Sequence, residues 1–152
     1  KENNITVVWE SDHPDARAIH LHPKQMGGAI LSLDWMNPKE SWKWAGPNWD
    51  KFVNTSLVNR FVGVEIQAEN PEDMKNTWQS VLNLKSERVI GNQINLDNTW
   101  IRFLEDEDGR GAGVSAFCLE ADDNNKLFEK ASDLGLVYKD NIMIGGVKFL
   151  LL

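Results

Sequence analysis

The sequence predicts an α+β fold in which β-α-β-β-β modules are repeated in tandem. Residues 61–68 and 113–121 alternate between apolar and polar side chains, as strands do, and an amphipathic helix pattern follows each of them. Closing strands follow each helix pattern. Aligning the helix starts, Asn70 with Asp122, gives an offset of 52, whereas the closing strands match at an offset of 46 because the second hairpin is shorter. We therefore expect an internal repeat of the module.

The first third of the chain, residues 1–56, is typical of the closing part of such a module. Its Leu31-Ser32-Leu33 alternation is a third version of the closing strand. Residues 37–56 contain Pro, Gly and Trp and are expected to form an ordered loop. Strands are predicted at residues 5–10, 18–22 and 29–35.

The other two thirds are divided into a β-α-β-β-β module at 57–111 and a β-α-β-β module at 112–152. Asn70 is placed as the N-cap of the first helix, with Pro71 at its first position. The acidic segment 105–111 lacks the spacing of a calcium-binding loop and is expected to be solvated. We expect the three parts to form one compact domain.

Composition excludes several classes of function. The 152-residue chain has a formal net charge of -7, a pI of about 4.9 and no Lys/Arg cluster, so nucleic acid and anionic membranes are unlikely partners. No apolar stretch approaches the length of a membrane span, and no signal peptide is visible, so a cytoplasmic location is expected. Cys118 is the single cysteine and is expected to be a reduced core thiol.

These patterns resemble a known superfamily. The segment from His22 to Leu33, HPKQMGGAILSL, and the paired modules with closing Gly-Gly-x-apolar-polar-apolar strands are similar to the vicinal oxygen chelate superfamily. Its members include glyoxalase I, extradiol dioxygenases, methylmalonyl-CoA epimerase and bleomycin-resistance proteins. The resemblance implies a curled, mixed β-sheet around a cleft that holds a divalent metal ion.

The residues depart from the metal site that the resemblance implies. The histidine of the first strand would fall on Gly63 in one module and on Ser115 in the other. The glutamate of the last strand would fall on Ser32, Arg102 and Lys148. Glycine offers no ligand, serine is a poor one, and the two cations repel a metal ion. We therefore expect no metal and no other cofactor at the usual position.

The same substitutions indicate a different ligand. If the resemblance holds, Arg102 and Lys148 both face the cleft, with Gln67 and Glu65 beside them, and suit a small anionic molecule such as a carboxylate or phosphate. The alternative is that both cations point outward on half-exposed strands, with Glu65 paired to Arg102. The further ligand-binding candidates are Trp100, Ser32 and Lys24.

The histidines leave three interpretations open. His20 and His22 could bind a metal ion with His13 or Asp34 as the third ligand, could transfer protons, or could be polar residues on an exposed strand. The catalytic candidates are His20, His22 and Glu65.

Two functions follow from these observations. The first is a glyoxalase-like protein that has lost the metal site of the superfamily. It binds a small anionic molecule, either without catalysis or with a cryptic activity. The second is a metal-dependent isomerase, lyase or dioxygenase of the superfamily, with His20, His22 and Glu65 as unusual ligands. Because the first segment resembles an incomplete module, we expect either a longer parent protein or a homodimer, possibly strand-swapped.

Overall fold

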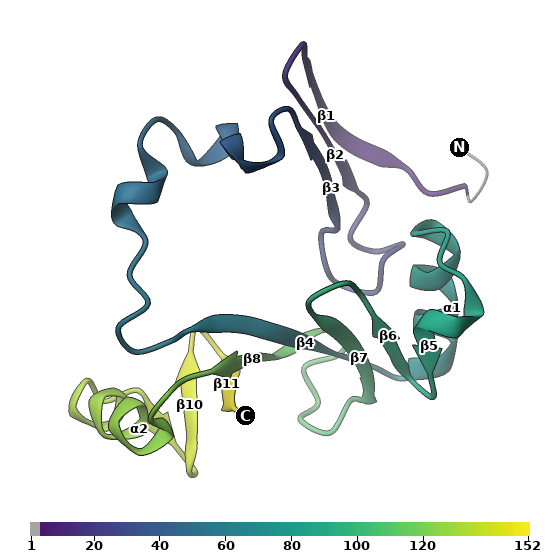
Figure 1. Ribbon diagram of the computed structural model, residues 1–152. Helices are drawn as coiled ribbons and strands as arrows, with labels where there is room; N and C mark the ends of the chain where they lie inside the picture. The colour runs from purple at the N-terminus through teal and green to yellow at the C-terminus, as the bar shows by residue number, and fades with distance from the viewer. Residues whose placement is uncertain (1–3) are drawn as a thin grey trace. The chain divides into compact units, whose positions relative to one another are not determined.

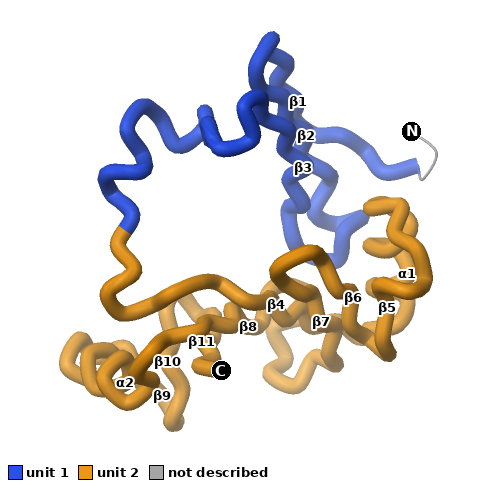
Figure 2. The backbone as a smooth tube through the Cα atoms, viewed as in Figure 1, with its two compact units in different colours: residues 1–53 blue, residues 54–152 orange. Residues whose placement is uncertain are grey.

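A computed structural model describes residues 4–152 of the protein. The chain divides into two compact units, residues 1–53 and 54–152, where the sequence had predicted one compact domain (Figure 2). The end of unit 1 consists of three short 3-10 helices, none of which contains a buried residue. They are η1 (Lys39–Ser41), η2 (Lys43–Ala45) and η3 (Trp49–Phe52).

Unit 1 is a three-stranded antiparallel sheet in the order β1-β2-β3 (Figure 1). The three predicted strands are present, but β1 starts two residues later than expected, β2 starts two residues earlier, and β3 starts three residues later. The strands are β1 (Val7–His13), β2 (Ala16–Leu21) and β3 (Ser32–Met36). Gly27 and Gly28 both have positive φ angles and turn the chain between β2 and β3.

Unit 2 is a mixed α+β structure built on one eight-stranded sheet that is not closed into a barrel. Its strand order is β5-β6-β7-β4-β8-β11-β10-β9. The first half contains β4 (Arg60–Ala68), α1 (Pro71–Val81), η4 (Ser86–Arg88), β5 (Val89–Ile90), β6 (Gln93–Asn95) and β7 (Trp100–Glu105). The second half contains β8 (Gly113–Glu120), α2 (Asn124–Asp133), β9 (Val137–Tyr138), β10 (Asn141–Ile144) and β11 (Val147–Leu151).

The strand pairing shows the repeat directly. β4 and β8 are antiparallel neighbours at the centre of the sheet, and each pairs in parallel with the closing strand of its own half, β7 or β11. The second half therefore has the same β-α-β-β-β topology as the first, whereas the sequence predicted β-α-β-β. The missed strand is β9, which at two residues is too short to show an alternating pattern.

Both helices start at an Asn or Asp side chain. The side chain of Asn70 accepts a hydrogen bond from the N–H of Asp73 at 3.1 Å, which confirms the predicted N-cap. In the second helix the cap is Asp123, which accepts from the N–H of Lys126 at 2.9 Å. Asp122, the residue expected to match Asn70, instead accepts from the Asn59 side chain at 2.6 Å.

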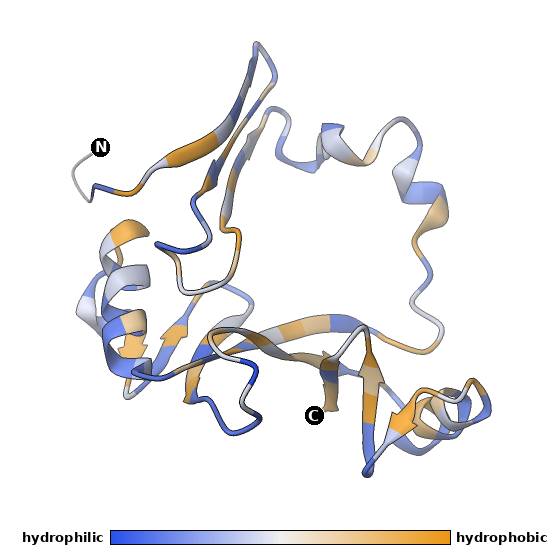
Figure 3. Ribbon diagram, turned by 180° about the vertical axis from the view of Figure 1, so that it is seen from behind, coloured by the Kyte–Doolittle hydropathy of each residue, from blue (hydrophilic) through white to orange (hydrophobic). Residues whose placement is uncertain are grey.

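The core of unit 2 lies between the sheet and its helices. Trp78 of α1 meets Phe103 of β7 edge-on, with ring centroids 5.8 Å apart, and Ile66 and Ile94 are almost fully buried. Figure 3 shows apolar segments along the strands and a hydrophilic loop at 105–111. Cys118 is a buried free thiol, as expected, and burial, followed by the negative charge of Glu65, raises its pKa to about 11. No helix among residues 4–152 is long and apolar enough to cross a membrane.

Candidate functional site

Four residues form a row across the centre of the unit 2 sheet. Arg102 on β7 is opposite Glu65 on β4, Glu65 is opposite Ala116 on β8, and Ala116 is opposite Lys148 on β11. Residues directly opposite one another on neighbouring strands project from the same face of a sheet. Arg102 and Lys148 therefore lie on the same face, at the two ends of the row. They are not counterparts in the repeat, because the N-caps Asn70 and Asp123 are 53 residues apart, which matches Glu65 with Cys118, and Cys118 is opposite Leu150.

A β-bulge changes the expected match on the first strands. Glu65 is opposite Ala116 while the next residue, Ile66, is opposite Val114, so Ser115 is an extra residue in β8. A matching bulge in β4 makes Val62 an extra residue between the pairs Phe61–Leu119 and Gly63–Cys118, so Ser115 corresponds to Val62 rather than to Gly63. The Ser115 hydroxyl is buried and donates to the backbone carbonyl of Glu65 at 3.2 Å.

Glu65 is paired with Arg102. The Nη1 atom of Arg102 lies 3.2 Å from Oε1 of Glu65, whose side chain is only 11% exposed. The Nε of Arg102 donates to the side-chain oxygen of Gln93 at 3.2 Å, and its guanidinium carbon lies 4.4 Å from the ring centre of Trp100. Of the two interpretations of these charges, the Glu65–Arg102 pair is therefore the arrangement present, and Arg102 already has three partners.

A pocket of about 190 Å³ lies beside this pair on the same face. Glu65, Gln67, Ser115 and Lys148 line it from the sheet, and the acidic loop contributes Glu105, Glu107 and Asp108. Arg102 is not one of the lining residues, so Lys148 is the cation of the pocket. Lys148 forms no ion pair or side-chain hydrogen bond with any residue between 4 and 152.

Gln67 fixes the acidic loop over the pocket. Its side-chain Nε2 donates to Asp106 Oδ1 at 3.1 Å, to Asp108 Oδ1 at 2.7 Å and to the Gly111 carbonyl at 2.9 Å. The loop is solvated, as expected, since residues 107–111 are exposed, and the buried Gln67 amide also holds it in place. The Arg110 guanidinium, and then the Gln67 amide, hold the pKa of Asp108 well below its usual range.

The first testable prediction concerns this carboxylate. Arg110→Met removes the hydrogen bond from Nε to Asp108 Oδ2 at 2.9 Å, so the pKa of Asp108 is expected to rise toward 3.8. A lowered folded-state pKa stabilises the protein above the unfolded value, and this contribution is lost as the pH falls through the folded value. An NMR titration of the side-chain carboxyl carbons measures the shift.

Glu120 provides the internal control for that titration. Its pKa is lowered by Arg60, which lies far from Arg110 in the sequence and pairs with Glu120 at 2.9 Å. The Glu120 value should be the same in both proteins. An unchanged Asp108 value in the variant would show that Arg110 is not its main partner.

The remaining candidates lie in unit 1 and have local partners. His20 is 4.5 Å from the Trp9 ring, measured between ring centres, and Nδ1 of His22 accepts from the Lys24 N–H at 3.2 Å. The Ser32 hydroxyl donates to Asp34 at 2.6 Å. His20, His22, Lys24 and Ser32 thus belong to unit 1, whereas Glu65, Gln67, Trp100, Arg102 and Lys148 belong to unit 2.

Glu65 supplies the single carboxylate of the row formed by Arg102, Glu65, Ala116 and Lys148. The carboxylate of Glu65 is paired with a guanidinium, and Lys148 brings positive charge to the same face. Within residues 4–152, no three His, Cys, Asp or Glu side chains are grouped so that they could hold a metal ion.

Two parts of the site were not expected from the sequence. One is the amide of Gln67 as the anchor of the 105–111 loop, and the other is the close fit of Trp100 against Gly63, its partner in the parallel β4–β7 pair. The sequence signal for the Gln67 anchor was the acidic segment 105–111 together with a polar residue on a predicted strand. No sequence pattern marks the second, because it depends on the register of two distant strands.

Comparison with models of known protein families finds no match, and no curated protein matches the sequence. Among solved structures, the fold is similar to that of methylmalonyl-CoA epimerase from Mycobacterium tuberculosis, with a TM-score of 0.47 and 17% sequence identity. The match covers 65% of this chain and 90% of the epimerase chain.

Proposed function

We propose that unit 2 binds a small molecule with an anionic group in the pocket between Glu65 and Lys148. The observation that carries this proposal is the pocket-lining position of Lys148, a cation that has no ion-pair partner among residues 4–152. A carboxylate or phosphate oxygen of the ligand would supply that partner. Catalysis forms no part of the proposal.

The carboxylates around the pocket restrict the kind of anion. Glu65 and Asp108 are neutralised by Arg102 and Arg110, but Glu105 and Glu107 form no ion pair with any described residue. A highly charged anion would be repelled by these two groups. The ligand that fits is singly charged at one end and carries hydroxyl or amide donors for the carboxylates at the other.

The second prediction tests this binding through Lys148. We expect at least one singly charged hydroxy acid, such as lactate or glycerate, to raise the Tm, whereas the corresponding neutral amide does not. At about 100 times the Kd, the stabilisation is about 2.7 kcal/mol, which corresponds to roughly 5–10 °C for a chain of this size. Lys148→Met should abolish the increase. The measurement is a thermal melt at constant ionic strength.

Lys130→Met is the matched control. Lys130 is an exposed lysine of α2 that does not line the pocket, so its loss changes the net charge by the same amount. The Lys130→Met protein should respond as the unmodified protein does. The proposal fails if no acid in the series stabilises more than its amide, or if Lys148→Met responds as strongly as Lys130→Met.

Elemental analysis of the protein purified without a chelator separates this proposal from a metal-dependent activity. Near-stoichiometric zinc, iron, manganese, nickel or cobalt that is lost on mutating His20 and His22 would favour the metal-dependent isomerase, lyase or dioxygenase instead. A chain without bound metal that is stabilised by hydroxy acids through Lys148 would support the binding function.

A further inference from the structure

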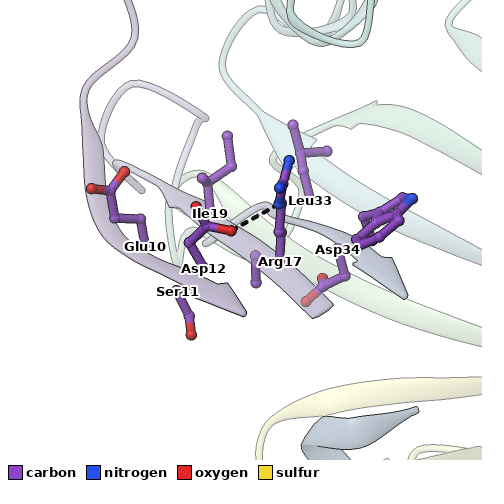
Figure 4. A pocket seen from close by; sticks show the side chains of 9 residues that line it. Glu10, Ser11, Asp12, Arg17, Ile19, Leu33 and Asp34 are labelled. Atoms are coloured by element: carbon purple, nitrogen blue, oxygen red, sulfur yellow. Dashed lines mark ion pairs between the residues drawn. The ribbon is translucent and has the colours of Figure 1, made fainter. Parts of the chain in front are cut away.

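One face of the unit 1 sheet carries a shallow pocket of about 410 Å³ (Figure 4). Its apolar floor is formed by Ile19 of β2 and by Leu33 and Trp35 of β3. Glu10 and Asp12 of β1 and Arg17 of β2 project from the same face, because each is directly opposite another lining residue or shares its strand parity. The Trp35 side chain is 47% exposed, so the face is open.

The hydrogen-bond pattern identifies the corresponding face in unit 2. The N–H of Leu21 donates to the Leu31 carbonyl, and the N–H of Phe103 donates to the Asn92 carbonyl. Each bond joins a closing strand to the strand before it, so Leu31 and Phe103 both belong to hydrogen-bonded pairs of an antiparallel ladder. Leu33 is two residues after Leu31 and therefore projects from the same face. On corresponding strands, residues of hydrogen-bonded pairs project from the same side of the sheet. The face of Leu33 in unit 1 is therefore equivalent to the face of Phe103 in unit 2.

In unit 2 a helix covers that face. α1 packs on β7, where Trp78 meets Phe103 and leaves it 1% exposed. Residues 4–53 contain no α-helix, and Leu33 and Trp35 stay partly or largely exposed. The open face of unit 1 therefore has an apolar floor like that of the Phe103 face in unit 2, which α1 covers.

The charges around the floor select the kind of helix. Two carboxylates, Glu10 and Asp12, project from the face of the floor with one guanidinium, that of Arg17, whereas Asp34 lies opposite Ala18 on the other face and accepts a hydrogen bond from Ser32. Arg17 is already paired with Asp12 at 2.8 Å. A helix with an apolar stripe and a basic flank matches this pattern, because a Lys or Arg side chain would lie opposite Glu10, which forms no ion pair with any residue between 4 and 152.

We propose that the open face of unit 1, formed by Ile19, Leu33 and Trp35 with Glu10 at its rim, binds a basic amphipathic α-helix of a partner protein. The helix would take the place on this sheet that α1 takes on its own, with apolar residues at positions i, i+3, i+4 and i+7 against the floor.

The test uses the full chain and a synthetic helical peptide of about 18 residues, with leucine on one stripe and lysine on both flanks. Titration should shift the NMR signal of the Trp35 indole N–H, with saturation. A peptide of the same composition in scrambled order should not shift it. Ile19→Asp places a charge in the floor and should weaken binding at least about tenfold.

Glu10→Lys keeps the test valid even if Ile19→Asp disturbs folding, because Glu10 is exposed and bonded to no other side chain among residues 4–152. This variant should bind the basic peptide several-fold more weakly. Glu40→Lys makes the same charge change on η1, away from the pocket, and should bind normally.

Several outcomes would overturn the proposal. They are binding of the scrambled peptide, equal binding by the Glu10→Lys and Glu40→Lys proteins, or an unshifted Trp35 signal. A concentration-dependent dimer that Ile19→Asp abolishes would also overturn it, since the occupant would then be a second copy of this chain.

Discussion

Phe103→Ala is expected to lower the free energy of unfolding of unit 2 by about 3–5 kcal/mol. Phe103 is 1% exposed, packs edge-on against Trp78 and lies on a strand that is paired on both sides. Removing its ring leaves a cavity that cannot collapse, because the strands on either side are fixed by their hydrogen bonds. Urea unfolding followed by far-UV circular dichroism measures the change.

Leu104→Ala is the control for that loss. Leu104 is the next residue on β7, projects from the opposite face and is 36% exposed. Its truncation should cost less than about 1 kcal/mol. Similar losses in the two variants would mean that the helix-covered face is not the main core of unit 2.

Gly63→Ala is expected to cost about 1–3 kcal/mol, although alanine is usually tolerated better than glycine in a strand. A Cβ atom at residue 63 would overlap the ring carbons of Trp100, so the ring or the backbone would have to shift. That ring cannot move freely, because it is stacked under the Arg102 guanidinium. Thermal unfolding of Gly63→Ala, alone and combined with Trp100→Ala, measures the cost.

The double variant separates crowding from other causes. Since Trp100→Ala makes room for the methyl group, the two changes together should cost less than the sum of the single changes. Gly91→Ala is the contrasting control: Gly91 has a φ of +56° and open space around it. Its cost comes from backbone strain, so Trp100→Ala should not relieve it. Strict additivity at Gly63 would contradict the crowding argument.

The fold could be predicted from the sequence mainly where elements are long and regular. Strands β4 and β8 alternate over eight or nine residues, and Asn70 and Pro71 mark the start of α1, so these elements follow from local pattern. β9 and the bulge at Ser115 do not, because each depends on which strand lies alongside. The division into two units likewise depends on buried surface that local pattern does not record.

The candidate site was predictable to a similar extent. The repeat predicted Arg102 and Lys148 on the closing strands, and both lie on one face of the sheet, but the registers put Lys148 in the place that Trp100 has in the first half. Which of the two cations has a partner was not predictable, since Glu65 reaches Arg102 across a parallel strand pair. The role of Gln67 depends on the folded path of the 105–111 loop, which has no periodic pattern.

The two halves of unit 2 meet at the central β4–β8 pair. A single polypeptide can have different residues at corresponding positions there, whereas two identical chains cannot. Val64 and Phe117 are counterparts in the two halves, and they are also directly opposite each other. In a symmetric dimer of one half, the same side chain would meet itself at that point. Joining the halves in one polypeptide lets the two positions differ, so Phe117 can contact Phe61 and Phe149 while the smaller Val64 lies opposite it.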